Sequence, residues 1–139
     1  MSDERRLDLS LLERALGRLT QALEAYDADP AMEALRDSVV MRFVFTYELL
    51  LQTVSRYVEL EHPKFTPESE MTKSRIVRRA NDLGVLRMEW EEFVKYRDAR
   101  NRVAHTYSEA KALQVVELAH SFAGEAQYLL LRIREKQLE

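Results

Sequence analysis

The residues best suited to chemistry lie in one stretch of fourteen, YRDARNRVAHTYSE, at positions 96–109. Within it, His105 titrates near neutral pH and can take a proton from a ribose 2′-hydroxyl. Arg100 offers a planar guanidinium that binds a phosphate and stabilises charge developing on it, and the amide of Asn101 can orient the histidine or a substrate. These are the groups that cleavage of RNA without a metal ion requires. The structural alternative is a basic helix end favoured by the helix dipole, with His105 hydrogen-bonded at the cap.

The spacing of these residues decides which of them can act together. Arg100 and Tyr107 are seven positions apart, so on a helix they project within about 20° of each other. Asn101 and His105 are four apart and are neighbours, whereas Arg100 and His105 are separated by roughly 140°. One straight helix therefore cannot aim Arg100 and His105 at one point. Either the helix ends between them, as a capping signal at Thr106 favours, or a second copy of the chain supplies the missing partner.

Basic residues are concentrated around this stretch. Residues 73–102 include nine basic and five acidic side chains, a net charge of +4, which leaves −7 for the rest of a chain whose net charge is −3. The segment is either a local anion-binding surface or a solvated helix face. Arg97 and Arg102 flank Arg100 and are further candidates for substrate binding. Because the whole chain is acidic, we expect any affinity for RNA to come from this segment and to weaken with salt.

The composition indicates the class of protein. A chain of 139 residues is long enough for one domain with a core, and we predict a single domain over residues 1–139. Three glycines and three prolines are too few for the turns of an all-β domain, which favours an all-α protein. The absence of cysteine excludes a disulfide framework, a thiolate metal site and a cysteine nucleophile. No metal-ligand pattern such as His-Glu-x-x-His is present, and we predict neither a metal nor a cofactor.

The start of the chain, MSDERRLDLS, is charged and has no apolar signal core. No uncharged run approaches the ~20 residues of a membrane span. We therefore expect a cytoplasmic protein with no membrane partner.

The first half of the chain predicts two helices. A leucine stripe at spacings of three and four predicts a helix over residues 3–26. Asp29 as an N-cap and Pro30 as the first helical residue predict the start of a second helix, which runs to about Glu61. The sequence EHPKFTPESE, residues 61–70, is then a linker.

The second half predicts three more helices. A short one ends near Gly84, a residue suited to a left-handed C-cap, and a fourth begins near Met88 and enters the stretch at 96–109. Thr106 or Ser108 caps the last helix. That helix has a buried stripe at spacings of four and three: Val115, Ala119, Phe122, Ala126, Leu129 and Ile133.

Residues 39–58 of the second helix are apolar around much of its circumference. A helix of this kind is buried on more than one side, so it is central in its bundle or also packs on a second subunit. Together the five elements predict an up-and-down bundle, similar to a four-helix bundle.

Two motifs resemble a known family. RNRVAHTY (100–107) resembles the Arg-x4-6-His signature of HEPN domains, and more closely the Arg-x4-His-x-Tyr form of HepT-like toxins. RFVFTYELL (42–50) resembles the second-helix motif of the subgroup called nucleotidyltransferase substrate-binding proteins. The order of the two motifs and the five-helix layout also fit this family across nearly the whole chain.

The resemblance implies a helical homodimer, often encoded beside a minimal nucleotidyltransferase. Many members are regarded as metal-independent RNase toxins of a toxin–antitoxin pair, and the nucleotidyltransferase neutralises them by attaching AMP to the tyrosine of the motif. Carried over here, Arg100 and His105 are catalytic, Asn101 is the polar residue that follows the arginine, and Tyr107 contacts RNA or accepts AMP.

Two other readings of the same motifs stay open. In the first, the chain is a non-catalytic subunit that presents a substrate to the nucleotidyltransferase. In the second, it is an adaptor in which the motif only stabilises a dimer. Cleavage of RNA by the isolated protein, and its dependence on His105, distinguish these readings from the nuclease.

Overall fold

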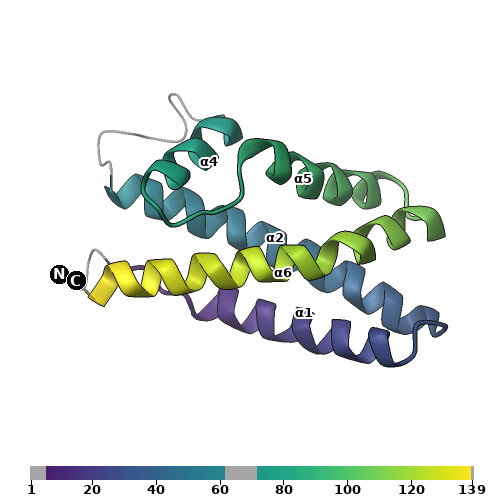
Figure 1. The fold of residues 1–139 in the computed structure, drawn as a ribbon. Coiled ribbons are helices and arrows are strands. Elements are labelled where there is room, and N and C mark those ends of the chain that lie inside the picture. The colour runs from purple at the N-terminus through teal and green to yellow at the C-terminus, as the bar shows by residue number, and fades with distance from the viewer. Residues whose placement is uncertain (1–5, 62–71, 139) are drawn as a thin grey trace.

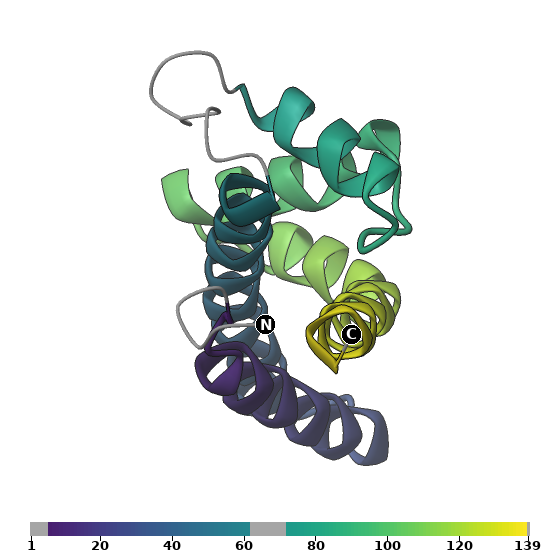
Figure 2. The ribbon, with the colours of Figure 1, turned by 90° about the vertical axis from the view of Figure 1, so that its left-hand side faces the viewer.

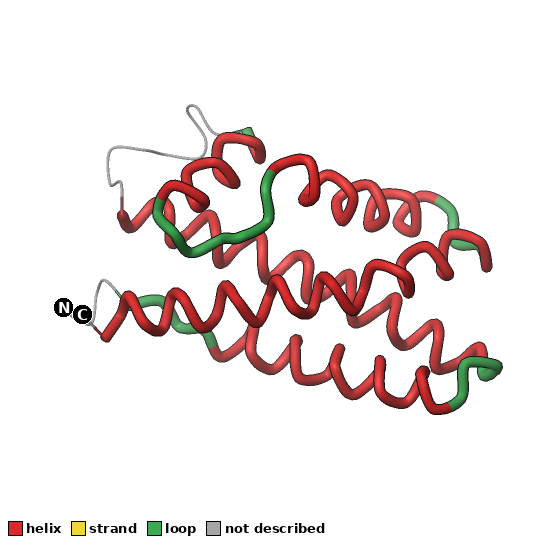
Figure 3. Tube along the Cα trace, viewed as in Figure 1, coloured by secondary structure: helices red, strands yellow, loops and turns green. Residues whose placement is uncertain are grey.

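The protein is all-α, as predicted. A computed structural model describes residues 6–61 and 72–138, and within these ranges it contains five helices and no strand (Figure 3). The long helices run up and down, and the short α4 lies beside α5 at one side of the bundle (Figure 1). The helices are α1 (Ser10–Ala28), α2 (Glu33–Glu61), α4 (Lys73–Asp82), α5 (Trp90–His105) and α6 (Glu109–Leu138).

Helix α2 is the centre of the bundle and contacts each of the other four helices. Seen along the long helices, α1 and α4 lie on opposite sides, with α2 and α6 between them (Figure 2). Side chains around much of the circumference of α2 are buried, among them Val39, Phe43, Leu50 and Val58. Contacts within one chain thus explain most of the wide apolar surface of this helix, while Met41 and Phe45 remain about half exposed.

An aromatic cluster joins α2, α5 and α6 in the core. The ring of Phe122 lies edge-on to Phe43, with 5.0 Å between centroids, and edge-on to Tyr96, at 5.1 Å. The rings of Tyr47 and Phe93 are 5.7 Å apart. Edge-to-face pairs of this kind are worth about 1 kcal/mol each beyond their buried area. They fix the position of α5, the helix that carries the candidate site.

The predicted start of the first helix was wrong. Residues 1–5 lie outside the described part of the chain, and α1 begins at Ser10 rather than before it. Two hydrogen bonds hold the preceding residues in another conformation. The backbone N–H of Leu7 donates to the side-chain amide oxygen of Gln137 at the end of α6 (2.6 Å), and the N–H of Ser10 donates to the Asp8 carboxylate (2.9 Å).

The predicted N-cap at Asp29 was also wrong. The backbone N–H of Asp29 donates to the carbonyl oxygens of Ala25 and Tyr26, so this residue closes α1. A turn at Pro30 follows, and α2 begins three residues later, at Glu33. The linker predicted from residue 61 onward falls almost wholly outside the described residues, except for Glu61 at the end of α2.

The turn between α4 and α5 is well defined. Gly84 has the positive φ (76°) that its sequence context predicted, and its carbonyl oxygen accepts a 2.9 Å hydrogen bond from Arg132 Nε of α6. The Asn81 amide donates to the carbonyl oxygens of Leu86 and Met88, both at 2.9 Å. Helix α5 then begins at Trp90, two residues after the predicted start.

Helix α6 buries the predicted stripe from Val115 to Ile133 completely. Its N-cap is Ser108, whose hydroxyl accepts from the Lys111 N–H (3.3 Å), and Thr106 instead closes α5. Although α2 and α6 have 29 and 30 residues, no helix in the described ranges is both long enough and apolar enough to cross a membrane.

Candidate active site on α5

Helix α5 is regular from Trp90 to His105 and ends only after the histidine. The backbone N–H of Thr106, the C-cap, donates to the Arg102 carbonyl oxygen (3.2 Å). A break between Arg100 and His105 was one of two possible solutions to their angular separation, and the structure excludes it within one chain. Both side chains leave the same uninterrupted helix, roughly 140° apart.

Arg100 is half-buried, and two neighbours engage its guanidinium. Nη2 forms a 2.7 Å ion pair with Glu48 of α2, and Nη1 donates to the amide oxygen of Asn101 (3.3 Å). Nε is fully buried and has no hydrogen-bond partner among the residues that the structure describes. The ion pair explains how α2 and α5 fix the direction of Arg100. It also means that a phosphate must displace Glu48 to reach this edge of the guanidinium.

A groove of about 460 Å³ lies between α2 and α5 beside Arg100. Apart from Arg100 and Asp37 its lining is apolar or aromatic, and the side chains of Met41, Phe45 and Tyr107 remain about half exposed on it. Exposed apolar side chains gathered at one groove are typical of a surface that another molecule covers. Its lining consists of Asp37, Val40, Met41, Val44, Phe45, Arg100, Val103, Ala104 and Tyr107.

Tyr107 is held at the edge of this groove. Its hydroxyl donates a short hydrogen bond to the carboxylate of Asp37, which also pairs with Arg36 (3.2 Å). The buried Arg36 reaches Glu109 at the start of α6 as well (3.4 Å). Partial burial, together with the hydrogen bond to Asp37, raises the pKa of Tyr107. The hydroxyl is therefore protonated at neutral pH and tied to α2.

His105 lies apart from this groove. Its side chain is exposed, and among residues 6–61 and 72–138 no hydrogen bond or ion pair involves its imidazole. Asn101 precedes it by one turn on the same side of α5. A single chain thus brings Arg100 and Tyr107 to one groove. Asn101, which accepts a hydrogen bond from Arg100, shares the side of α5 on which His105 faces solvent.

The two flanking arginines point elsewhere. Arg97 pairs with its neighbour Asp98 (3.1 Å), and its guanidinium lies over the ring of Trp90, 5.3 Å from the centroid. Arg102 donates to the side-chain oxygen of Gln114 on α6 (3.4 Å). Neither of them lines the groove beside Arg100.

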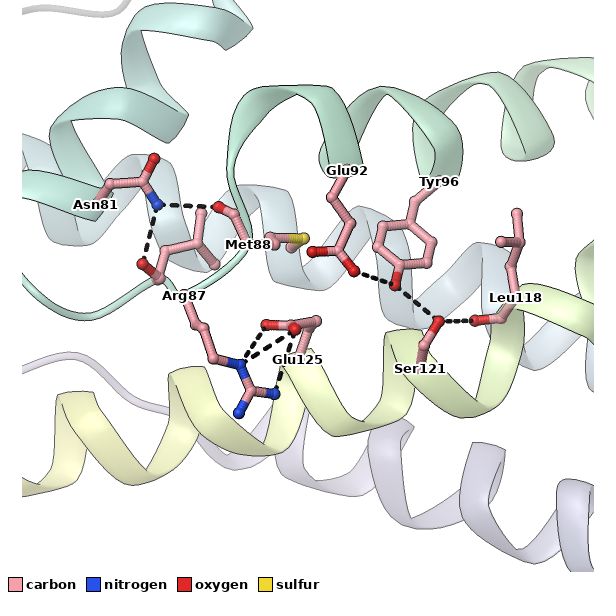
Figure 4. A network of polar contacts seen from close by, with 9 residues as sticks. Asn81, Arg87, Met88, Glu92, Tyr96, Leu118, Ser121 and Glu125 are labelled. Carbon is pink, nitrogen blue, oxygen red and sulfur yellow. Dashed lines mark hydrogen bonds and ion pairs between the residues drawn. The ribbon is translucent and has the colours of Figure 1, made fainter.

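A polar network holds the first half of α5 against α6 (Figure 4). The hydroxyls of Tyr96 and Ser121 are 2.8 Å apart, Tyr96 also contacts Glu92 (3.3 Å), and Ser121 donates to the Leu118 carbonyl oxygen. Arg87, just before α5, pairs with the buried carboxylate of Glu125 (3.2 Å).

Sequence reasoning missed several groups around the site. Glu48 lies within the RFVFTYELL motif, so that motif was the signal that could have identified the partner of Arg100. Arg36 and Asp37 carry no such signal, because only the fold brings them to Tyr107. Tyr47 is buried with a hydroxyl that has no hydrogen-bond partner, and burial raises its pKa to about 12.

The fold and the site define a class: a helical bundle whose penultimate helix presents an arginine beside a groove and a histidine toward solvent. Residues 7–135 match the family described as "Nucleotidyltransferase substrate binding protein like". The chain belongs to that family.

Two comparisons give this membership a structural and a functional context. The probable ribonuclease HepT of Haemophilus influenzae is 27% identical over an alignment of 139 positions that covers 94% of this chain and 94% of the other. A solved structure from the same organism, described as revealing the fold of a substrate-binding domain of a nucleotidyltransferase, is similar with a TM-score of 0.81 at 27% identity. The superposition covers 91% of this chain and 99% of the other.

Proposed function

We propose that this protein is a metal-independent endoribonuclease that works as a homodimer in the cytoplasm, as the toxin of a pair whose antitoxin is a minimal nucleotidyltransferase. The likeness to a probable ribonuclease supports the activity. The observation that carries the proposal is the division of α5: Arg100 lies at a groove, while His105 projects unpartnered in another direction. An exposed histidine with no hydrogen bond or ion pair to the described residues is available for chemistry.

In the proposed reaction, His105 takes the proton of a ribose 2′-hydroxyl. The oxygen then attacks the adjacent phosphorus, and the bond from phosphorus to the 5′-oxygen breaks. The products are a 2′,3′-cyclic phosphate and a 5′-hydroxyl, whose proton comes from water. Arg100 stabilises the negative charge that accumulates on the phosphate oxygens. Asn101, which already accepts a hydrogen bond from Arg100, positions the guanidinium.

A second copy of the chain completes the site in this proposal. The half-exposed Met41 and the apolar groove between α2 and α5 offer a surface that a second copy can cover. In a two-fold symmetric dimer each copy presents the same surface to the other. The Arg100 of one copy can then meet the His105 of the other, which one helix alone cannot achieve.

The first experiment is cleavage of end-labelled RNA by the purified protein in EDTA. His105→Ala is compared with His120→Ala, which removes an exposed histidine paired with Asp27 (3.0 Å). Because His105→Ala removes the general base, its rate of RNA cleavage is expected to be about 10²–10⁴-fold lower than that of wild type. His120→Ala is expected to cleave RNA at the wild-type rate. An intact-mass measurement first establishes that Tyr107 is unmodified. If the unmodified wild type leaves a range of RNAs uncut, the nuclease proposal is wrong.

Mixing two inactive variants tests the shared site. If Arg100→Ala and His105→Ala chains exchange freely, half of the dimers are mixed, and each has one intact pair, so about a quarter of the wild-type activity returns. A monomer in light scattering at micromolar concentration, or no recovery after chain exchange, contradicts the shared site but leaves the nuclease proposal standing.

A non-catalytic substrate-binding subunit is the second candidate. Two observations favour it: the description of the similar solved structure, and the ion pair with Glu48 that already engages Arg100. This reading predicts that the protein binds RNA or a nucleotide without cutting it, and that His105→Ala changes neither binding nor stability.

Tyr107 is the proposed acceptor of AMP from the nucleotidyltransferase. An adenylyl group there adds bulk and negative charge at the groove that contains Arg100, so RNA phosphates are repelled. The hydroxyl must first leave the Asp37 carboxylate. Incubation with the nucleotidyltransferase and ATP is expected to raise the intact mass by one or more AMP units in the wild type, and to leave Tyr107→Phe unchanged.

A further inference from the structure

We infer that a second groove, between α1 and α2, binds the phosphate backbone of single-stranded RNA and leads the strand toward Arg100. This inference rests on the proposed ribonuclease function. The groove has a volume of about 230 Å³, and no acidic side chain lines it. Its walls are formed mainly by three arginines and three apolar residues: Arg14, Arg18, Arg42, Leu11, Phe45 and Leu49.

The three arginines of this groove differ from six others in the chain. Within residues 6–61 and 72–138, Arg14, Arg18 and Arg42 form no ion pair with a carboxylate. Ser10 donates the hydrogen bonds to the Asp8 carboxylate that lower its pKa, and the charge of Arg14 contributes to that lowering. By contrast, six arginines each pair with a carboxylate: Arg36, Arg87, Arg97, Arg100, Arg132 and Arg134.

This contrast matters because the chain has more acids than bases. With a net charge of −3, it has more carboxylates than cationic side chains. Even so, the three arginines of this groove form no ion pair with a carboxylate of the described residues. Guanidinium groups bind phosphate oxygens through paired N–H donors. An unpaired cluster on an otherwise acidic surface is a local site for a polyanion.

The placement of the three side chains fits an extended strand. Arg14 and Arg18 are one turn apart on α1, about 6 Å along its axis, and Arg42 faces them from α2 across the groove. A single strand can follow a narrow groove of this size, and backbone contacts to arginine need no particular base sequence.

The groove is also adjacent to the proposed catalytic region. Phe45 borders both this groove and the one that contains Arg100. A strand held by the three arginines therefore comes within one side chain of the groove that contains Arg100, at the edge of the surface proposed for the second copy. Lys73 and Arg78 of the basic segment at 73–102 are not placed in this way, because they lie on α4, away from α1.

Two triple variants with the same change in charge separate these surfaces. In one, Arg14, Arg18 and Arg42 become Gln. In the other, Lys73, Arg78 and Lys95 become Gln. The probe is a fluorescent 2′-O-methyl oligoribonucleotide, which cannot be cleaved because it has no free 2′-hydroxyl. Anisotropy titrations between 50 and 200 mM salt give the affinity and its salt dependence, and circular dichroism checks that both variants fold.

The first variant is expected to lose at least about tenfold in affinity at 100 mM salt. The slope of log affinity against log salt is expected to fall by about 2, since each single-strand phosphate contact contributes about 0.7. The second variant is expected to stay within about twofold of wild type. If both variants lose affinity equally, only net charge matters and the groove is not the site. If the first variant binds as wild type does, the inference is wrong and the groove serves another anion, such as an acidic protein segment.

Cleavage of unmodified RNA distinguishes failure of this inference from failure of the proposed function. A wild-type protein that binds the probe through the groove but cuts nothing contradicts the nuclease. A first variant that cuts at the wild-type rate with the wild-type KM contradicts the groove and leaves the nuclease intact.

Discussion

The two halves of α5 differ in how deeply their side chains are buried. In the first half, Phe93 and Tyr96 are each only 1% exposed, and the Tyr96 hydroxyl has partners on α5 and α6. In the second half, His105 projects into solvent and Arg100 borders an open groove. The first two turns of this helix thus hold it in the core, and its last two turns carry Arg100 and His105. The anchored half sets the direction of the exposed one.

The same difference appears in how polar atoms are satisfied. Arg87 and Glu125 pair near the start of α5. By contrast, the Arg100 Nε and the hydroxyl of Tyr47, a residue of α2 whose ring packs on Phe93, are buried, and neither has a hydrogen-bond partner in the described part of the chain. An unsatisfied buried polar atom costs about 1–3 kcal/mol, and such atoms are rare in native structures. The unsatisfied atoms near Arg100 therefore lower the free energy of unfolding, and packing in the first half of α5 offsets this loss. Such local losses are common at functional sites.

The largest expected effect comes from removing the anchor. Phe122→Ala deletes a ring that contacts both Phe43 and Tyr96 in the core, and should lower the free energy of unfolding by about 3–5 kcal/mol. Urea denaturation followed by circular dichroism measures this. Leu131→Ala, on the exposed side of the same helix, is the control and should stay within about 0.5 kcal/mol. Equal losses for the two variants would mean that the aromatic cluster is not the anchor.

The next effect falls on the exposed half. Arg100→Lys keeps a positive charge beside Glu48 but loses the planar fork, so RNA cleavage should fall about 10²–10³-fold while the melting temperature changes little. Arg102→Lys, on the same helix but facing Gln114, should lose at most a few-fold. If Arg100→Lys has a much lower melting temperature but keeps its cleavage activity, Arg100 is a structural residue. That result favours the adaptor, in which the motif only stabilises a dimer.

How far the sequence predicts this molecule depends on the range of the interactions involved. Helix stripes such as Val115–Ile133 depend on residues three or four positions apart, so the all-α bundle and its core could be predicted. Helix ends were less certain because distant groups decide them: Gln137, 130 positions away, holds Leu7 outside α1. Local capping preference at Asp29 was outweighed by its backbone bonds to α1.

For the candidate site, the sequence indicates which residues are candidates for chemistry but not how they are paired. The angular separation of Arg100 and His105 follows from helix geometry and could be predicted. The ion pair between Arg100 and Glu48 joins positions 52 apart, and the hydrogen bond from Tyr107 to Asp37 joins positions 70 apart. Residue spacing in the sequence does not predict such pairs, because they depend on how the helices pack against one another.

A smaller effect tests the hydrogen bonding of the anchored half. Tyr96→Phe keeps the ring in the core but removes a hydroxyl that contacts Ser121 (2.8 Å). Because Ser121 retains its bond to the Leu118 carbonyl oxygen, the loss should be only about 1 kcal/mol, with RNA cleavage unchanged. A loss above about 3 kcal/mol in urea denaturation would show that the hydroxyl network, rather than ring packing, fixes α5.

The smallest effect has the opposite sign and concerns a buried hydroxyl of α2. Tyr47→Phe removes a hydroxyl that has no hydrogen-bond partner among the described residues, so no such bond is lost, and stability at pH 7 should be unchanged or rise by up to about 1 kcal/mol. A clear loss would mean that the hydroxyl has a partner in solution, such as a buried water shared with Arg100 Nε.

The pH dependence of stability provides a second, independent readout of Tyr47. Burial raises its folded pKa to about 12, whereas an unfolded tyrosine titrates near 10. Above pH 10 the unfolded chain releases this proton while the folded protein keeps it, so stability is fully present below pH 10 and is lost as pH rises toward 12. Without the hydroxyl this contribution disappears. The free energy of unfolding should therefore fall less steeply for Tyr47→Phe than for wild type between pH 9 and 11, and parallel curves would place the Tyr47 hydroxyl in contact with solvent.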